Sequence, residues 1–579
     1  MTIHKIEPNR GLTDPGSVRP GDVVRLMPGK TGVHGTPLMI AGLRGTAKAP
    51  ILITSDGNDS VTVSGPMSEE EARLFLNRET KRRQHGGYYP APGYLGDLAA
   101  ITLRDCQFVL LDGLYFRECW PTAIYVDDCR FVGVRSCRIE GSTIAIGVND
   151  SDTRHILIEG NHWQQDMSEK HNLWNAIPWV DVHGASNNGG KPVDVDNDKR
   201  HLDGDFVRCW DIAGDLTVRD NDVTDAFNGV HVFNRVDQIA PGVDPTSLPF
   251  NEFRRASANV LIENNRFTRI RDNVFEPEEH AWNWVIRHNR LLDCYVPFSL
   301  ELHRAGWFYI YGNMAAAITG PSKDINEPGH HRKGFAMFKT GGLQNNEGPI
   351  HVMFNSFAIA GNRRYFRRGA LSRLEHRNNA IQFFGENPDF FGRDGSQPGP
   401  GADGKIGVDP LGAELLAERN RFTRRWDGSL LEGLDCDSHT LARADLGIAM
   451  DGDIINDADF PEIFKSLGYP IGRASLNGSA DFPIPDPLPT NAQEVYLTAQ
   501  SAEVLGNSIP LLLELHNGDT HSIGGGIDRG AHQSTANGVT ALKALDAAFG
   551  FLPNANWADT IPRAKIPEKR RLEKSQAAV

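Results

Sequence analysis

One pattern of apolar and polar positions recurs along the chain. In Val260-Leu-Ile-Glu-Asn-Asn265 and Trp284-Val-Ile-Arg-His-Asn289, apolar residues alternate with others and an asparagine follows. A period of two is typical of a β-strand with one buried face. The asparagines that follow such segments are Asn161, Asn221, Asn265, Asn289, Asn313, Asn355 and Asn379. The pattern therefore predicts many short strands, each leading into the same kind of turn.

The spacing of these asparagines indicates a solenoid. Asn265, Asn289 and Asn313 lie 24 residues apart. The same interval separates two further pairs, Asn355 from Asn379 and Cys137 from Asn161. A β-sandwich would show alternation without a fixed period. We therefore predict an all-β, right-handed parallel β-helix with ~24-residue coils, long loop insertions and small helical caps.

Asparagine suits the corner of such a coil for two reasons. It adopts the left-handed backbone conformation more readily than most residues, so we expect the repeated asparagines themselves in that conformation. Stacked amide side chains can also hydrogen-bond to one another along the axis. The alternating Val, Ile and Leu residues are expected to line the interior.

The chain divides into four predicted parts. Residues 1–100 are entry coils with a helical insertion, because Ser68 followed by acidic residues is typical of a helix start. Residues 101–385 are central coils that carry the candidate site, and residues 386–535 are C-terminal coils and loops. Residues 536–579 are a helical cap and tail, with Val539, Leu542, Leu545 and Phe549 at helical spacing.

Three segments resemble those of a known superfamily. Pro20-Gly-Asp-Val-Val-Arg-Leu-Met-Pro-Gly29 and Gly45-Thr-Ala-Lys-Ala-Pro-Ile-Leu-Ile53 resemble the opening coils of the pectate-lyase-like parallel β-helix superfamily, especially its chondroitinase B and alginate lyase group. Ile523-Gly-Gly-Gly-Ile-Asp-Arg-Gly-Ala-His532 resembles the closing segment of many bacterial β-helix enzymes, with His532 where an aromatic residue is usual. The resemblance implies a carbohydrate polymer as substrate and favours a polysaccharide lyase.

The net charge limits the classes of binding partner, and the cysteine pattern indicates the state of the thiols. The net charge of −14 argues against nucleic acid, although a local basic cleft on an acidic protein can still bind an anionic polysaccharide. The seven cysteines include no CxxC pair, and several fall in strand patterns, so we expect reduced, buried thiols. The oligomeric state stays open between a monomer and a homo-oligomer.

The chain shows neither the apolar core of a signal peptide at its start nor a run of 18 apolar residues. As written it is expected to be cytoplasmic and without a membrane partner. It would be secreted or periplasmic if a leader had been removed.

Titratable residues gather in the central coils. His231 lies between Val230 and Val232, so alternation points it outward, and Glu276 and Glu278 share one strand face. Counted from the repeated asparagines, His231 is 10 residues after Asn221, Glu276 is 11 after Asn265, and Glu301 is 12 after Asn289. Coils about 4.8 Å apart would stack these groups in a column, where one carboxyl group takes a raised pKa or a cation sits between them.

The candidate site is therefore assigned by residue type. The catalytic candidates are Asp205, His231, Glu276, Glu278, Glu301 and Lys339. The substrate-binding candidates are Trp282, His303, Arg304, Trp307, His331 and Arg332. Asp203 and Asp272 could hold Ca²⁺, which prefers oxygen ligands, and no other cofactor is expected. For Trp284 and Phe308, a place in the core is the better interpretation.

The leading hypothesis is a lyase that cleaves a uronate-containing polysaccharide by β-elimination. Lys339 or His231 would be the base, and Arg304 or Arg332 would neutralise the uronate carboxylate. The Lys-then-Arg arrangement of the chondroitinase B and alginate lyase group is not found at matching positions. Two alternatives stay open: a glycoside hydrolase with paired carboxylates, and a glycan-binding protein of the tail-spike kind. An epimerase is less favoured, because its Asp-Pro-His-Asp signature is missing.

Overall fold

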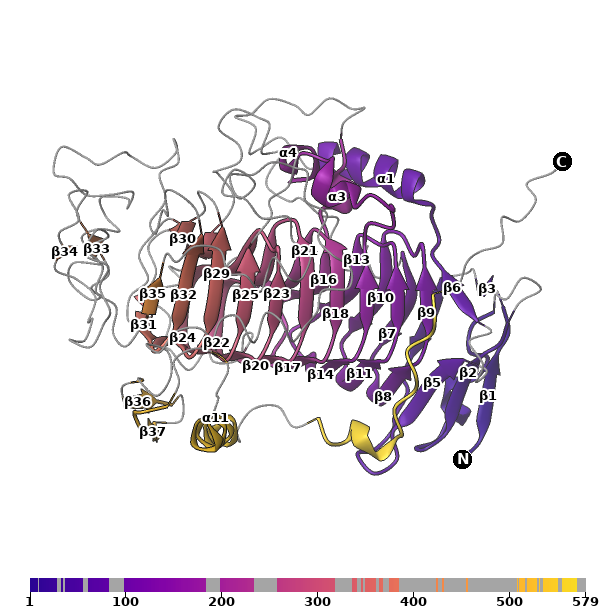
Figure 1. Cartoon of the computed structure of the whole chain (residues 1–579). Helices are drawn as coiled ribbons and strands as arrows, with labels where there is room; N and C mark the ends of the chain where they lie inside the picture. Colours follow the sequence, from indigo (N-terminus) through magenta and orange to yellow (C-terminus); the bar gives the residue numbers. More distant parts are fainter. Residues whose placement is uncertain are drawn as a thin grey trace, which may run out of the picture.

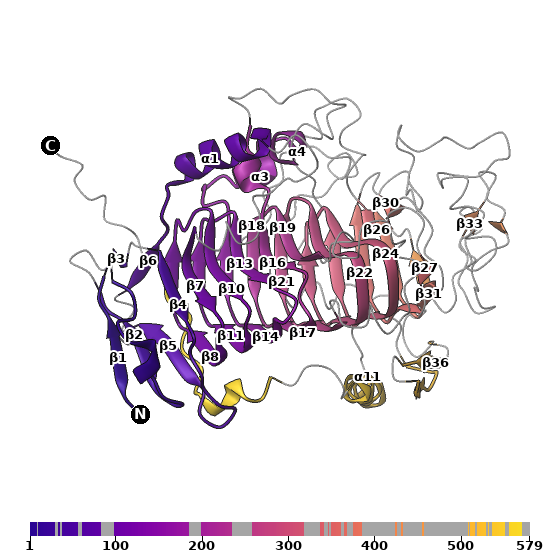
Figure 2. The ribbon, with the colours of Figure 1, turned by 180° about the vertical axis from the view of Figure 1, so that it is seen from behind.

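The computed structural model describes much of the chain. The described residues are 1–8, 10–28, 33–34, 37–55, 61–82, 98–183, 198–233, 258–317, 336–340, 345–346, 349–360, 364–367, 374–384, 423–424, 430–431, 454–456, 508, 510–515, 518–527, 531, 535–549 and 555–569. Strands from successive coils stack side by side in parallel and form a long right-handed β-helix (Figures 1 and 2). This confirms the fold predicted from the asparagine period.

Three ladders of parallel strands form the walls of the helix. The first ladder contains β4 (Leu38–Ala41), β7 (Ala99–Arg104), β10 (Thr122–Asp127), β13 (Ile144–Asn149), β16 (Asp205–Trp210), β19 (Asn228–Phe233), the first part of β22 (Asn273–Arg287), the first part of β24 (Val296–Tyr311), β26 (Ala336–Thr340) and β30 (Arg364–Arg367). Because β22 and β24 continue around a corner, they join this ladder to the second in one large sheet.

The second ladder contains β1 (Ile3–Ile6), β2 (Val23–Leu26), β5 (Ile51–Ser55), β8 (Gln107–Asp112), β11 (Arg130–Arg135), β14 (Arg154–Glu159), β17 (Gly214–Arg219), β20 (Ala258–Glu263), the later parts of β22 and β24, β28 (Ile350–Met353) and β31 (Leu374–Arg377). The short β27 (Asn345–Asn346) pairs with the middle of β24. The third ladder contains β3 (Val33–His34), β6 (Thr62–Ser64), β9 (Tyr115–Arg117), β12 (Arg138–Glu140), β15 (His162–Gln164), β18 (Asp222–Ala226), β21 (Arg266–Ile270), β23 (Arg290–Leu292), β25 (Met314–Ala317), β29 (Ser356–Ala360), β32 (Ala380–Phe384) and β35 (Ile454–Asn456).

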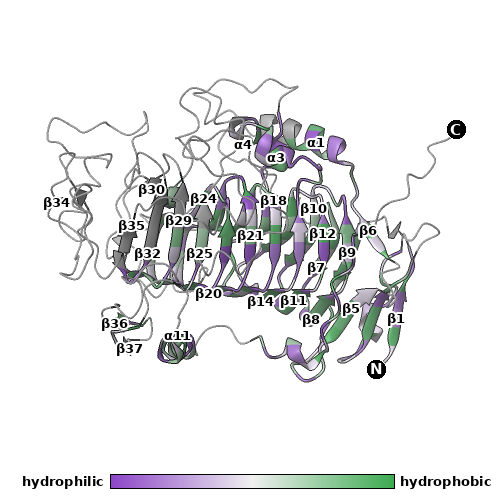
Figure 3. Cartoon of the chain, in the orientation of Figure 1, coloured by the Kyte–Doolittle hydropathy of each residue, from purple (hydrophilic) through white to green (hydrophobic). Residues whose placement is uncertain are grey.

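The interior is a continuous apolar column. Alternate residues of each strand face inward, and the hydropathy colouring shows apolar and polar residues alternating along many strands (Figure 3). Trp284 and Phe308 stack within this core, as the sequence indicated. Cys106, Cys119, Cys129, Cys137, Cys209 and Cys294 are free and buried, which confirms the predicted role for these six. Cys436 lies outside the described residues.

A ladder of seven asparagines runs along one corner of the core. Each side-chain amide from Asn161 to Asn355 donates to Oδ1 of the next asparagine over 2.9–3.0 Å, ending at Asn379. Cys137 heads the ladder, because its backbone N–H donates to Asn161 Oδ1 over 2.9 Å. The predicted stacking of asparagines is therefore confirmed.

The residue before each ladder asparagine makes the sharp turn. Asp220, Asn264 and His288 all have φ between 56° and 58°, and the residues preceding the other ladder asparagines are also left-handed. The ladder asparagines themselves do not have positive φ. The prediction that they adopt the left-handed conformation is wrong, because the turn must come one residue earlier to point the amide inward toward the next coil.

Helical insertions cover the corner between the third and first ladders. They are α1 (Glu69–Arg82), α3 (Asn172–Asn175), α4 (Trp179–His183) and the 3-10 turn η3 (Arg200–Leu202). Ser68 caps α1, since its hydroxyl accepts from Glu71 N–H and its own N–H donates to the Glu71 carboxylate, as the sequence predicted. The helices lie together along one edge of the solenoid (Figure 1) and share an apolar cluster with Trp120 and Phe227.

C-terminal segments pack along the outside of the second ladder. The antiparallel hairpin of β36 (Leu511–Glu514) and β37 (Thr520–Ile523) and the helix α11 (Ala536–Ala548) cover Leu261, Val285 and Tyr309. The helix is predicted correctly, although it lies against the side of the solenoid and leaves Val539 40% exposed. A second, short hairpin joins β33 (Thr423–Arg424) and β34 (Leu430–Leu431).

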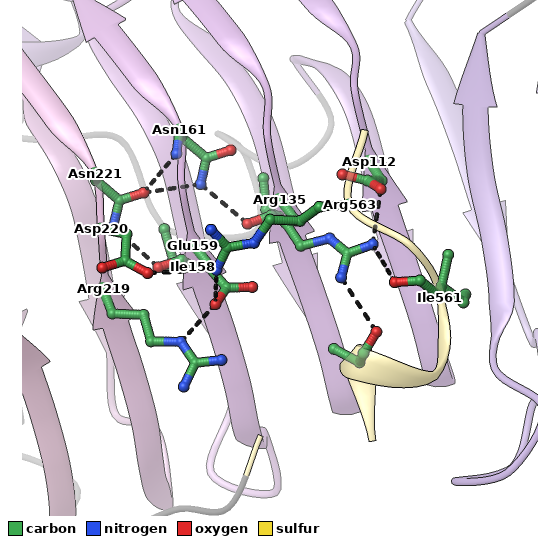
Figure 4. A network of polar contacts seen from close by, with 12 residues as sticks. Asp112, Arg135, Ile158, Glu159, Asn161, Arg219, Asp220, Asn221, Ile561 and Arg563 are labelled. Carbon is green, nitrogen blue, oxygen red and sulfur yellow. Dashed lines mark hydrogen bonds and ion pairs between the residues drawn. The ribbon is translucent and has the colours of Figure 1, made fainter. Parts of the chain in front are cut away.

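Residues 555–569, here called the C-terminal strap, run back over β8, β11 and β14 (Figure 4). The strap includes the 3-10 turn η6 (Ala558–Thr560), and a similar turn, η1 (Pro15–Ser17), lies near the start of the chain. The strap contributes Trp557 and Ile561 to an apolar contact with Leu110 and Leu157. It also receives hydrogen bonds from Arg135, which donates to the carbonyl groups of Ala558, Ile561 and Pro562.

Candidate functional site

Strand register brings the predicted titratable residues together on the outer face of the first ladder. Arg208 of β16 pairs with His231 of β19, and His231 pairs with Glu276 of β22. The next coil continues this column with Ser299, since Phe275 pairs with Phe298, and Ser299 pairs with Lys339 of β26. The column predicted from the asparagine spacing therefore exists for His231 and Glu276, and Arg208 and Lys339 extend it. The prediction is wrong for Glu301, whose strand position pairs with Glu278 instead, because the offset of 12 residues from Asn289 lies two residues beyond Ser299.

A second column of paired strand positions runs beside the first. Trp210, Phe233, Glu278 and Glu301 pair in successive coils. Trp210 joins an apolar patch with Tyr125 and Ile144, against which the half-buried Phe233 packs. The guanidinium carbon of Arg208 lies 5.6 Å from the centre of the Trp210 ring. A largely buried aromatic cluster thus adjoins the charged residues on the N-terminal side.

His231 lies at the centre of a charged cluster. Its Nε2 is 2.8 Å from Glu278 Oε2, while its Nδ1 is 3.2 Å from Glu276 Oε2 and 3.4 Å from Asp205 Oδ1. Arg208 contacts the same Nδ1 and lies 3.3 Å from Asp205 Oδ2. We define the charged cluster as Asp205, Arg208, His231, Glu276, Glu278 and Lys339.

Two outward asparagines position Glu276. The Asn273 side-chain amide donates to Glu276 Oε1 over 2.5 Å. The backbone N–H of Asn273 donates in turn to Asn228 Oδ1 over 3.0 Å, which ties β22 to β19. These bonds hold the carboxyl group beside the imidazole.

Burial and neighbouring charges separate the protonation states of the cluster. Burial raises the pKa of Glu276 to about 7, although His231 and Lys339 oppose the rise. Burial also acts to raise the pKa of Glu278, but the hydrogen bond and charge of His231 lower it to about 2. For His231 itself, burial and Arg208 act to lower the pKa, and the surrounding carboxylates outweigh them and raise it to about 10. At neutral pH, His231 is therefore cationic, Glu278 is anionic and Glu276 is close to its midpoint.

A second group of titratable side chains adjoins this cluster at the corner. His183 of α4 lies with Nδ1 3.5 Å from Asp203 Oδ2. Burial raises the pKa of Asp272, although Lys339 and His183 act to lower it. Since Lys339 also lowers the pKa of Glu276 and Glu278, its ammonium group links the two sets of carboxyl groups.

The predicted metal ligands have other partners in the structure. Asp203 faces His183, and Asp272 is buried close to Lys339 and His183. Within the described part of the chain, no group of three or more His, Cys, Asp and Glu side chains is placed to hold a metal ion. The expected Ca²⁺ site thus remains a prediction.

Several predicted substrate-binding residues lie away from the charged cluster or outside the described residues. Trp282 is buried and pairs with Ala258 and Gly306 in the second ladder, where it contacts the half-buried Trp307. The structure thus does not bring these two rings into the charged cluster, because β22 and β24 turn a corner before them. The side chains of Glu301, His303 and Arg304 lie outside the described residues, as do His331 and Arg332 entirely.

Sequence reasoning missed three side chains near the site. Arg208 is outward on β16 and could have been found by alternation, since it lies between Val207 and Cys209. Trp179 and His183 come from an insertion without periodicity, so no repeat pointed to them.

None of the helices among the described residues combines the length and the apolar composition that a membrane span needs.

Fold and site together define a parallel β-helix protein with a buried charged cluster on the outer wall of one ladder. No protein-family model and no curated protein matches the chain. Among solved structures, a mannuronic acid specific polysaccharide family 6 lyase from human gut microbiota is 11% identical with a TM-score of 0.32, over 83% of this chain and 99% of that one.

Pectate lyase Pel9A is 10% identical with a TM-score of 0.32, over 92% of this chain and 97% of that one. The GH136 lacto-N-biosidase from Eubacterium ramulus is 12% identical with a TM-score of 0.28, over 67% and 64%. Likenesses this distant carry no conclusion about what this chain does.

Proposed function

We propose that this protein degrades a polysaccharide and that it cleaves a uronate-containing polymer by β-elimination at the charged cluster. The observation that carries the proposal is the combination of three cationic groups with one carboxyl group that titrates near neutrality. Arg208, protonated His231 and Lys339 lie in one column with Glu276. The cluster sets these three cations against the carboxyl groups of Asp205, Glu276 and Glu278, so an anionic substrate would meet positive groups here despite the net charge of −14.

β-Elimination removes the proton next to the uronate carboxylate and breaks the glycosidic C–O bond on the adjacent carbon, so it needs a base, a cation that neutralises the carboxylate and a proton for the departing oxygen. The proton that the base takes up can be passed to that oxygen. Glu276, with a pKa of about 7, is half ionised at neutral pH and can accept the proton. Lys339, which is only half-buried, is the cation that can pair with the carboxylate. His231 was one of two predicted bases, but a pKa of about 10 makes it a cation in this proposal.

The test is absorbance near 235 nm after mixing the protein with polygalacturonate, alginate and chondroitin. An unsaturated uronate end absorbs there, so rising absorbance supports elimination. Glu276→Gln should abolish the rise, whereas His155→Gln, on the second ladder, should leave it unchanged. Parallel traces with Ca²⁺ and with EDTA test the expected calcium dependence. A flat trace for every polymer would reject the lyase.

The opposed pKa shifts of Glu276 and Glu278 favour a glycoside hydrolase as second candidate. A protonated and an ionised carboxyl group side by side are the pair that hydrolysis requires. The hydrogen bond of Glu278 to His231 counts against this role, because it engages the carboxylate that would attack or activate water. New reducing ends without absorbance at 235 nm would establish hydrolysis instead.

A further inference from the structure

The helix α4 places two aromatic rings at the edge of the charged cluster. Trp179 and His183 are one helical turn apart, and their ring centroids lie 4.5 Å apart with 27° between the planes. Phe227, which is fully buried, lies 6.3 Å from the His183 ring at 20°. The three rings form a stack with a buried inner end and a half-buried outer end at Trp179.

A carboxylate fixes how the imidazole is turned within this stack. Asp203 Oδ2 lies 3.5 Å from His183 Nδ1, so the ring edge that carries Nε2 is directed away from Asp203. The His183 side chain is 27% exposed, although rings lie on both of its faces. Asp203 thus acts as a positioning residue for an edge that can hydrogen-bond.

Lys339 joins the ring stack to the charged cluster. Its charge acts on His183 and Asp272 on one side, and on Glu276 and Glu278 on the other. Its ammonium group is therefore near enough to act on both the ring stack and the carboxyl group proposed as base, from whose strand it is separated by Ser299 in the same column. Aromatic faces beside a few placed polar groups are the usual make-up of a sugar site.

We propose that Trp179, His183 and Lys339 form a subsite for one acidic sugar unit of the polymer. Trp179 stacks on the sugar ring, His183 hydrogen-bonds a hydroxyl group, and Lys339 pairs with the carboxylate. The inference rests on the proposed function for its polymer, but not on which bond is cleaved. It gives the helix α4 a role in choosing the substrate.

The chain offers a matched control for this subsite. His155 also stacks on an aromatic ring, Phe131, at 4.2 Å and 12°, and it lies 3.3 Å from Asp215. This pair belongs to the second ladder, on another side of the solenoid from the charged cluster. Loss of the imidazole there should cost as much packing but no binding.

The experiment is isothermal titration of polygalacturonate, alginate and chondroitin, each in native and carboxyl-reduced form. For the polymer that binds the wild type, Trp179→Ala and His183→Gln should each weaken binding about tenfold, because each removes one stacking or hydrogen-bonding contact. His155→Gln should bind like the wild type. Carboxyl reduction should weaken binding to the wild type but not to Lys339→Met. Unchanged unfolding temperatures would show that the variants are folded.

The outcomes separate the subsite from the chemistry. Wild-type affinity in both Trp179→Ala and His183→Gln overturns the subsite, even if absorbance at 235 nm still rises. An equal loss in His155→Gln also overturns it, as does a panel in which no polymer binds. Selective loss of binding in the α4 variants, with no cleavage by the wild type, supports the subsite and rejects the lyase.

Discussion

Replacing Arg135 by methionine should release the C-terminal strap. The Arg135 side chain is 1% exposed and donates to Asp112 Oδ2 over 2.8 Å, as Figure 4 shows. It also donates to three strap carbonyl groups, those of Ala558, Ile561 and Pro562, over 3.0–3.1 Å. One buried guanidinium thus holds together two segments more than 400 residues apart in sequence.

The magnitude follows from what the substitution leaves behind. Removing one partner of a buried ion pair costs about 3–5 kcal/mol, because the other charge stays buried without compensation. Here that charge is Asp112, whose side chain is 2% exposed. This loss acts on the strap, since its three carbonyl groups lose a charged donor and its opening returns Asp112, which accepts from Ala564 N–H, to water. We expect the strap to open more easily by about 4 kcal/mol, which is roughly a 1,000-fold larger open population.

Hydrogen exchange followed by mass spectrometry measures this opening. Peptides from 555–569 should exchange roughly 1,000-fold faster in Arg135→Met, while peptides from β20 to β24 keep their protection. Adding Asp112→Asn should restore part of the protection, because it removes the uncompensated carboxylate. Lys569→Met is the control: Lys569 of the strap donates to Gln164 Oε1 over 3.4 Å, but its side chain is 58% exposed, so its loss should cost under about 1 kcal/mol. Wild-type protection in Arg135→Met, or an equal effect of Lys569→Met, would refute the reasoning.

Three further predictions concern the ladder and the cluster. Asn289→Ala removes four side-chain hydrogen bonds in a buried corner, so it should lower the free energy of unfolding by about 4 kcal/mol and the unfolding temperature with it. Asn149→Ala is the control and should leave the unfolding temperature nearly unchanged, because Asn149 is half-buried and makes one such bond. His231 has a pKa raised to about 10, so its protonated form stabilises the fold fully below pH 6.5 and no longer does so once pH has risen through about 10. The wild type should therefore unfold at a higher denaturant midpoint than His231→Gln below pH 6.5, and the difference should vanish toward pH 10; a difference that widens with pH would contradict this. If Glu276 is the base, kcat/KM should rise with pH to a plateau above about 7, and Glu276→Gln should lose at least about 100-fold; a profile that falls through pH 7 would make Glu276 an acid.

The repeat could be predicted from sequence because the interior of a β-helix imposes it. Each ladder asparagine must reach the next one along the axis, so its position in the coil cannot vary. Offsets counted from the ladder therefore carry over to the outer face, which is why His231 and Glu276 could be placed in one column. The left-handed residue was assigned one position too late, since alternation alone does not show which residue of a turn has positive φ.

The other residues of the site could not be predicted from the repeat, because their positions depend on insertions and corners that interrupt it. Between Asn161 and Arg208 the chain leaves the coil and returns, so the offset that placed His231 from Asn221 does not place Arg208. Trp282 and Trp307 lie away from the charged cluster for a related reason. Their strands run on around a corner, and residues close in sequence to Glu278 end in a different ladder.

Insertions nevertheless obey one spatial rule in this fold. The segment with α1 leaves the third ladder at β6 and enters the first at β7, and the segment with α4 does the same between β15 and β16. Insertions at the same corner of different coils must meet in space, and His201 indeed lies 3.1 Å from Glu69. Period and corner together therefore tell which insertions border a site. Which of their side chains face it depends on packing such as that of His183 between Trp179 and Phe227, which no repeat encodes.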